Sequence, residues 1–216
     1  MTHATTVPAA APVPAVVPLA LLEAVRGLDR PPPDALDEFH PELSTKRLGL
    51  NRTVALEIER LQRMGPRGRV SAGELGALLR LVARRQDAAL VFSEAGRGAA
   101  RYAFRRLSVS GRAARHLLPR PLRARLGFGA AARLSAQVLG IRLVREAGGV
   151  VTAEPAAGAA PPERGSACTF YGAAVAELLR LLTDFDGAMV HVACLARGGV
   201  TCRWRSARAA SEASPS

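Results

Sequence analysis

The chain has 216 residues, 49% of them hydrophobic and only 4% aromatic, and its formal net charge is +12. This length and apolar content are typical of one globular domain with a sizeable core and argue against an intrinsically disordered chain. No apolar run reaches the roughly 18 residues of a membrane-spanning helix, and residues 1–18 lack the basic start and long apolar core of a signal peptide. We therefore expect a cytoplasmic protein, free or peripheral to the inner membrane.

A tail and a poorly defined segment precede the main domain. Residues 1–18 are a Pro/Ala-rich tail, and their prolines favour neither a helix nor a strand ladder. Residues 19–49 are a poorly defined segment, with a short helix expected at 19–28 and an irregular, polar stretch at 34–50. Apolar residues at helical spacing then predict a helix over 51–64, where the main domain, residues 50–205, begins.

The middle of the chain is predicted to be mostly helical. Ser71 and Glu74 form a capping box that opens a helix through residue 85. A second helix is expected over 87–107 and a third over 121–139, with Pro121 in its first turn. Two strands follow, at 141–145 and 150–153, and residues 206–216 form a small polar tail. The sequence thus predicts an α+β domain with helices packed on a small antiparallel sheet.

All three cysteines lie in the last 50 residues. Cys168 stands at the head of an amphipathic helix that we expect to run to about residue 185, and a strand is expected over 188–196. An Arg-Gly-Gly turn then leads to a partner strand at 200–204. Because Cys194 and Cys202 flank this turn, the hairpin brings their sulfurs together, and Cys168 can reach the same point.

Three cysteines and a histidine are an ordinary ligand set for structural zinc. The candidate ligands are Cys168, His191, Cys194 and Cys202. His191 is three residues before Cys194 on a strand, so the two point to opposite faces unless a bulge or the strand end turns one of them. The alternative is three small buried thiols. A disulfide is disfavoured because the cysteine count is odd and no signal peptide is recognised.

The pattern at these positions resembles the 4-vinyl reductase domain family. That family carries a Cys at the head of a helix, an acidic residue on a strand, a Cys three residues later and a Cys after a hairpin turn; His191 here stands where the family usually has Glu. Residues 95–104, 117–126 and 168–180 look like its bacteriochlorophyll 4-vinyl reductase branch. The resemblance covers roughly residues 50–205.

The resemblance implies an α+β ligand-binding fold, similar to those of trafficking-complex subunits and nitric-oxide sensors, that holds a structural zinc ion and often forms dimers. It also implies a role in bacteriochlorophyll biosynthesis, acting on or carrying porphyrin intermediates near the 8-vinyl reduction step. We find no Gly-x-Gly-x-x-Gly motif after a strand, hence no recognisable nicotinamide or flavin site, and zinc cannot supply electrons. No Ser/His/Asp set or carboxylate pair can be assigned as catalytic.

The net charge is concentrated in one section of the chain. Residues 96–145 contain 12 Arg and no Asp or Glu, and the remaining 18 basic residues equal the 18 acidic ones. A solvated helical face, an anionic membrane surface, porphyrin propionates and nucleic acid are all compatible with this charge. Nucleic acid is disfavoured because few aromatic residues accompany the arginines. For a carboxylated tetrapyrrole, the candidate contacts are Arg97, Arg101, Tyr102, Arg105 and His116.

Three hypotheses follow, in this order. The first is a zinc-stabilised 4-vinyl reductase-type domain that binds a tetrapyrrole as a carrier or accessory factor, in contact with biosynthetic enzymes. The second is a sensor or adaptor module of the same fold that binds another small hydrophobic ligand and signals through a protein partner. The third is a reductase that takes electrons from another subunit.

Overall fold

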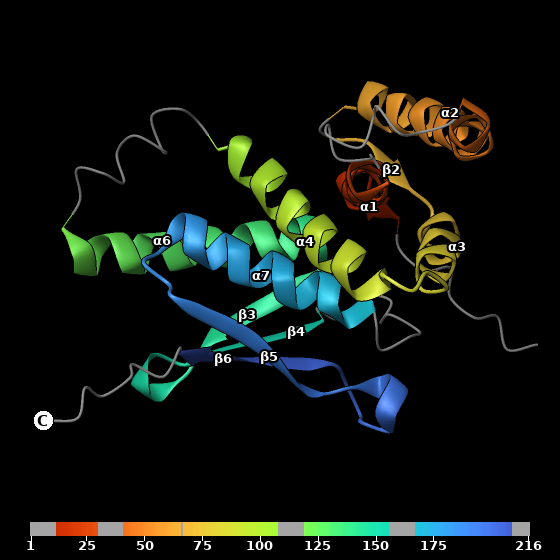
Figure 1. The fold of residues 1–216 in the computed structure, drawn as a ribbon. Coiled ribbons are helices and arrows are strands. Elements are labelled where there is room, and N and C mark those ends of the chain that lie inside the picture. The colour runs from red at the N-terminus through yellow and green to blue at the C-terminus, as the bar shows by residue number, and fades with distance from the viewer. Residues whose placement is uncertain (1–11, 30–40, 66, 108–118, 156–166, 209–216) are drawn as a thin grey trace, which may run out of the picture.

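The computed structural model describes residues 12–29, 41–65, 67–107, 119–155 and 167–208, and the statements below concern these residues. A layer of helices covers one face of a four-stranded antiparallel sheet, and a smaller group of helices lies beside that layer (Figure 1). The expected α+β class is therefore confirmed. Within the described residues, no helix has the length and hydropathy needed to cross a bilayer.

The sheet is built from two hairpins joined side by side. Its strand order is β3-β4-β6-β5, with β3 at Ile141–Arg145, β4 at Val151–Pro155, β6 at Arg203–Arg208 and β5 at Gly187–Ala193. Inward-facing side chains of these strands, among them Ile141, Val151 and Trp204, are buried under the helices. The open face carries exposed residues such as Val190 and Val192. One buried face and one open face explain the alternating sequence of β5.

Two helices form the centre of the molecule. α4 (Ala88–Arg105) and α7 (Cys168–Leu182) pack along each other and supply much of the core. Gly96 allows their close approach, since a Cβ there would lie 2.3 Å from the carbonyl oxygen of Phe170. Small residues on the inner face of α4 continue this contact: Ala95, Ala99, Ala100 and Ala103 are almost fully buried. The Ala-rich composition is therefore used for tight helix packing.

The other end of α7 is held by α6 (Arg120–Leu134). A Cβ added at Gly127 would lie 1.8 Å from the carbonyl oxygen of Leu182, so the backbones touch directly. α6 runs into a π-helical turn, Ser135–Leu139, and ends at Gly140, whose φ of 65° is left-handed. The helix expected over 121–139 is thus present, but its last turn is wider than an α-helix.

The smaller group of helices contains the N-terminal part of the chain. α1 (Val16–Leu28) packs on α4, α2 (Pro41–Arg63) packs on α1, and α3 (Ala72–Val82) follows the short strand β2 (Arg69–Val70). The Ser71 hydroxyl accepts a hydrogen bond from the backbone N–H of Glu74 at 3.0 Å, which confirms Ser71 as the cap, while the Glu74 carboxylate of the predicted capping box pairs with Arg60. α3 ends three residues before the predicted position.

Some expected boundaries are wrong. Residues 13–18, assigned to a structureless tail, form the strand β1 (Val13–Pro14), paired with β2, and the first turn of α1. Pro18 is tolerated there because an N–H in the first turn of a helix has no partner in the helix. Likewise α2 begins at Pro41, inside the stretch expected to be irregular, with proline at its first position.

The C-terminal hairpin also differs from the prediction. β5 ends at Ala193, a 3-10 turn covers Leu195–Arg197, and β6 begins at Arg203 and extends to Arg208, into the expected tail. The turn is long because Gly198 is left-handed, with a φ of 82°, and the Gly199 N–H bonds back to the Cys194 carbonyl. The hairpin partner therefore starts three residues later than expected.

Candidate metal centre

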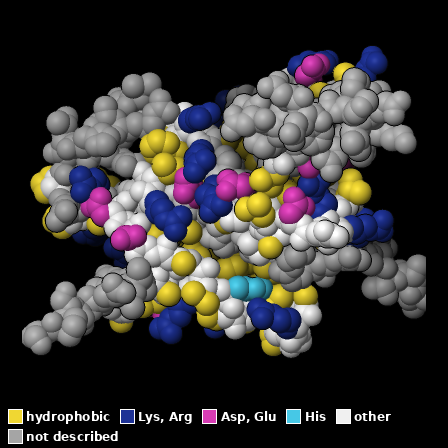
Figure 2. Space-filling model, viewed as in Figure 1, with side chains coloured by type: hydrophobic (Ala, Val, Ile, Leu, Met, Phe, Trp, Pro, Cys, Tyr) yellow, Lys and Arg dark blue, Asp and Glu magenta, His cyan; other side chains and the backbone are white. Residues whose placement is uncertain are grey.

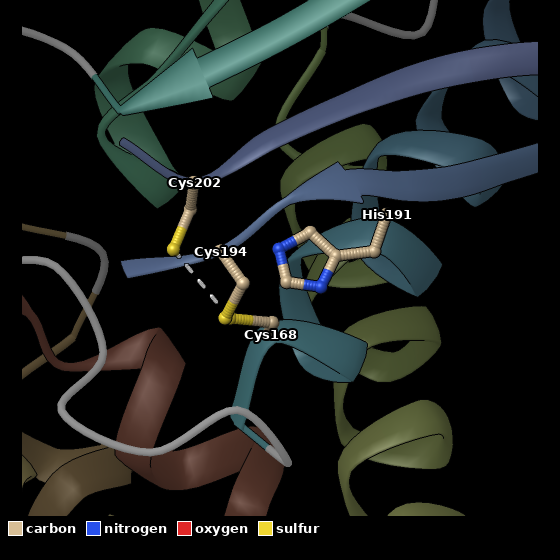
Figure 3. A group of neighbouring side chains, drawn as sticks. All are labelled: Cys168, His191, Cys194 and Cys202. Carbon is tan, nitrogen blue, oxygen red and sulfur yellow. Dashed lines mark hydrogen bonds between the residues drawn. The ribbon is translucent and has the colours of Figure 1, made fainter. Parts of the chain in front are cut away.

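The four predicted ligands come together at one point. Cys168, His191, Cys194 and Cys202 each place a ligand atom within 4.8 Å of the others. Cys168 Sγ lies 4.0 Å from Cys194 Sγ and 3.7 Å from Cys202 Sγ. Figure 3 shows the sulfurs and the imidazole ring converging between the head of α7 and the β5–β6 hairpin. These residues could hold a metal ion.

A break in the strand register brings His191 to the same side as Cys194. His191 pairs with Trp204 and Ala193 pairs with Arg203, so two steps along β5 match one step along β6. The extra residue in β5 is a β-bulge. On a regular strand the two side chains would point to opposite faces, so the bulge is what lets both reach the centre.

The imidazole of His191 is held on two sides. Its ring stacks on the indole of Trp204, with the centroids 5.1 Å apart and the planes at 18°. Its Nδ1 lies 3.3 Å from a guanidinium nitrogen of Arg197. Its Nε2 is buried and has no hydrogen-bond partner among the described residues. A buried nitrogen without a partner costs free energy, and a bound metal would supply the missing partner.

The sulfurs are buried as well. Cys168, Cys194 and Cys202 are 1%, 3% and 0% exposed. Burial raises the pKa of Cys168 well above its ordinary value, and the neighbouring Cys202 and Cys194 raise it further. Burial also opposes ionisation of Cys194, but hydrogen bonds from the Ala196 backbone, the Arg197 guanidinium and the other two thiols together lower its pKa. A second thiolate in the cluster therefore requires a cation.

The distances fit a tetrahedral ion. Ligand sulfurs about 2.3 Å from zinc lie about 3.8 Å from each other at tetrahedral corners, close to the two sulfur separations above. The donor set, thiolate with imidazole, also suits zinc and similar borderline ions better than calcium or magnesium. An ion bound by all four residues would have every tetrahedral corner filled by a protein side chain, as in sites that stabilise a fold.

No protein-family model, no curated protein and no solved structure matches this chain.

The predicted tetrapyrrole contacts lie on α4 and mostly have protein partners. Arg97 donates to Glu94 at 2.5 Å, and Arg101 donates to Glu177 at 2.8 Å. Tyr102 packs against the apolar cluster of α1 and α2, and Arg105 is exposed on the last turn of α4. His116 lies outside the described residues. The structure thus places these arginines on α4 but does not bring them to the metal centre.

Sequence reasoning missed three side chains that matter here. Arg197 was assigned only to the turn, although a basic residue close to a cysteine can contact and stabilise its thiolate. Trp204, the single tryptophan, lies two residues after Cys202, and side chains two residues apart on extended backbone point to the same face, which places the indole beside the site. Glu177 is an 8%-exposed carboxylate on α7 that no local pattern identifies, because its partner Arg101 is 76 residues away.

Proposed function

We propose that this protein is a zinc-stabilised ligand-binding domain of the 4-vinyl reductase type. The observation that carries the zinc part is the convergence of three buried sulfurs and the unpartnered Nε2 of His191 on one point. Zinc would be held by Cys168, His191, Cys194 and Cys202, and it would tie the head of α7 to the β5–β6 hairpin. With four protein ligands, no corner remains open for a substrate, so the role of zinc there is to supply folding free energy.

Arg197 supports this assignment through its charge. Zinc with three thiolates and a neutral imidazole carries one net negative charge, and the guanidinium next to Cys194 and His191 offsets it. When Nε2 binds zinc, Nδ1 carries the imidazole hydrogen and can no longer accept from Arg197. In the loaded site we therefore expect Arg197 to interact with the Cys194 thiolate.

For the ligand, we propose a tetrapyrrole intermediate of bacteriochlorophyll biosynthesis, held by this protein as a carrier or accessory factor. This part rests on the resemblance stated above. Two of the segments that carry it, residues 95–104 and 168–180, lie in α4 and α7, which pack against each other. The ligand's propionates would replace the carboxylates of Glu94 and Glu177 as partners of the Arg97 and Arg101 guanidinium groups.

Metal analysis tests the zinc proposal. Protein purified without chelator should contain about one zinc per chain, and Cys168→Ser and Cys202→Ser should each lose most of it. Thr201→Ser, which alters the neighbour of Cys202 but no ligand, is the control. Trp204 gives a second readout, because its indole stacks on the His191 ring and should change emission when zinc is removed. Wild-type metal content in both cysteine variants would exclude the site.

A titration of the zinc-loaded protein with magnesium protoporphyrin and with a chlorophyllide tests the ligand proposal separately. We expect saturable binding, a shifted Soret band, and weaker binding in Arg97→Gln/Arg101→Gln than in the control Arg67→Gln/Arg84→Gln. Zinc-loaded protein that binds neither compound would overturn the tetrapyrrole assignment while leaving the zinc site intact. The sensor or adaptor function, with another small hydrophobic ligand, would then take its place.

A further inference from the structure

The outer face of α6 exposes large apolar side chains. Leu122 and Leu126, one helical turn apart, are 46% and 57% exposed. The opposite face of the helix is the one that packs, through Gly127 on α7 and through Ala131, which is fully buried. The two leucines therefore contribute little to the core and lie open to contact by a partner surface.

The same face carries positive charge without compensation. α6 contains four arginines and no acidic residue. Arg123 is paired with Asp184 at 2.7 Å. Arg125 and Arg133 are exposed and fall on the side of Leu122 and Leu126, at helical spacing, and neither is paired with a carboxylate in the part of the chain that the structure describes. The outer face of α6 thus combines leucine and arginine.

Neighbouring structure adds to this surface. The Arg145 guanidinium lies over the ring of Phe128, 4.6 Å from its centroid, so β3 places another cation next to α6. α6 also lies in the section of sequence, residues 96–145, that holds the whole net charge of the protein. In Figure 1, α6 lies at one edge of the helix layer, next to the end of α7 that is farther from Cys168.

We propose that the outer face of α6 docks on an anionic lipid surface, with Leu122 and Leu126 entering the boundary between headgroups and acyl chains. The surface offers the two kinds of group that attachment to an anionic interface uses, apolar side chains and neighbouring cations. Arginine stems lie along the apolar region while their guanidinium groups bind lipid phosphates. A nucleic acid would use the charges but gives no role to two exposed leucines. Cys168 lies at the opposite end of α7, a helix about 22 Å long, from the Leu182 contact with α6.

Flotation of the full-length protein with lipid vesicles tests this inference. At about 0.1 M salt, the protein should bind vesicles of phosphatidylcholine with one quarter phosphatidylglycerol and should not bind pure phosphatidylcholine. Arg125→Gln/Arg133→Gln should weaken binding about 30-fold, since each cation near an anionic surface contributes about fivefold. Leu122→Ser/Leu126→Ser should weaken it about tenfold, with unchanged circular dichroism and melting temperature.

Matched variants separate docking through α6 from attraction by the overall charge. Arg67→Gln/Arg84→Gln removes the same charge from exposed sites outside α6, and Leu81→Ser/Leu90→Ser removes exposed leucines from α3 and α4. Both should bind vesicles like the wild type. Equal losses in the α6 and control variants, or no loss with Leu122→Ser/Leu126→Ser, would overturn the proposal. Binding of duplex DNA that depends on Arg125 and Arg133 and ignores the leucines would assign the surface to nucleic acid instead.

Discussion

The two ends of α7 are fixed by different means. At its C-terminal end, the backbone of Leu182 touches α6 at Gly127, the Thr183 hydroxyl donates to the Leu179 carbonyl at 2.6 Å, and Asp184 pairs with Arg123. Every contact there is made by the protein alone. At its N-terminal end, Ala167 offers no side-chain cap, and Cys168 meets two other thiols and a nitrogen without a partner.

If the proposed zinc ion binds, the difference indicates that the N-terminal end of α7 is the one that depends on it. The backbone contact, the hydroxyl hydrogen bond and the ion pair at the C-terminal end are complete when the chain folds. At the N-terminal end, three cysteine sulfurs and a histidine nitrogen that can bind a metal lie buried together, and the positive end of the helix dipole favours thiolates there. Zinc would complete this end by binding all four donors.

Removing the metal should loosen one end of α7 and leave the other intact. With free zinc a thousandfold above its dissociation constant, the bound ion contributes about 4 kcal/mol to the free energy of unfolding, and a chelator should remove it. Hydrogen exchange should then increase in the first turn of α7 and in the β5–β6 hairpin, while the contact between α6 and the end of α7 stays protected. Uniform loss of protection would show that both ends depend on the metal.

The C-terminal end of α7 should instead be destabilised by a single methyl group added to α6 at Gly127. Gly127→Ala places a Cβ 1.8 Å from the Leu182 carbonyl oxygen and should lower the free energy of unfolding by about 1–3 kcal/mol. Gly129→Ala, on the same helix with no atom within 4 Å of the new Cβ, should raise it by up to about 1 kcal/mol through helix propensity. Denaturant unfolding measures both values. Neither substitution should change the zinc content, so a loss of zinc in Gly127→Ala would contradict the independence of the two ends.

The sequence was informative about local structure and about the donor set. The Ser71 cap, the strand at residues 141–145 and the α7 helix each rest on a short pattern that the structure reproduces. The four donor residues could be named because so few cysteines are present and their spacing fits a helix and a hairpin. These are properties of neighbouring residues, which a sequence displays directly.

What the sequence could not predict depends on contacts between distant segments. The bulge that turns His191 toward Cys194 exists because β5 pairs out of step with β6, and neither strand alone reveals it. β1 forms only because residues 69–70 lie beside it, in spite of a proline-rich sequence. The burial of Glu177 likewise requires α4 to bring Arg101. Tertiary packing overrides local preference at each of these places.

The smallest predicted effect concerns an ion pair near the metal end of α7. The Arg97 guanidinium holds the pKa of Glu94 below its ordinary value, so the carboxylate stabilises the folded state above the ordinary glutamate range, and this contribution is lost as the pH falls through the lowered pKa. Because both side chains are about one-third exposed, Glu94→Gln should lower the free energy of unfolding by only about 0.2–1 kcal/mol at pH 7.

Unfolding of the chelated protein from pH 7 to pH 3 measures this contribution, since metal loss in acid then has no influence. The difference between Glu94→Gln and wild type should shrink toward zero in acid, whereas Glu59→Gln, in the more exposed pair with Arg63, should show little difference at any pH. A constant difference across this range would mean that Glu94 acts by packing and not by charge.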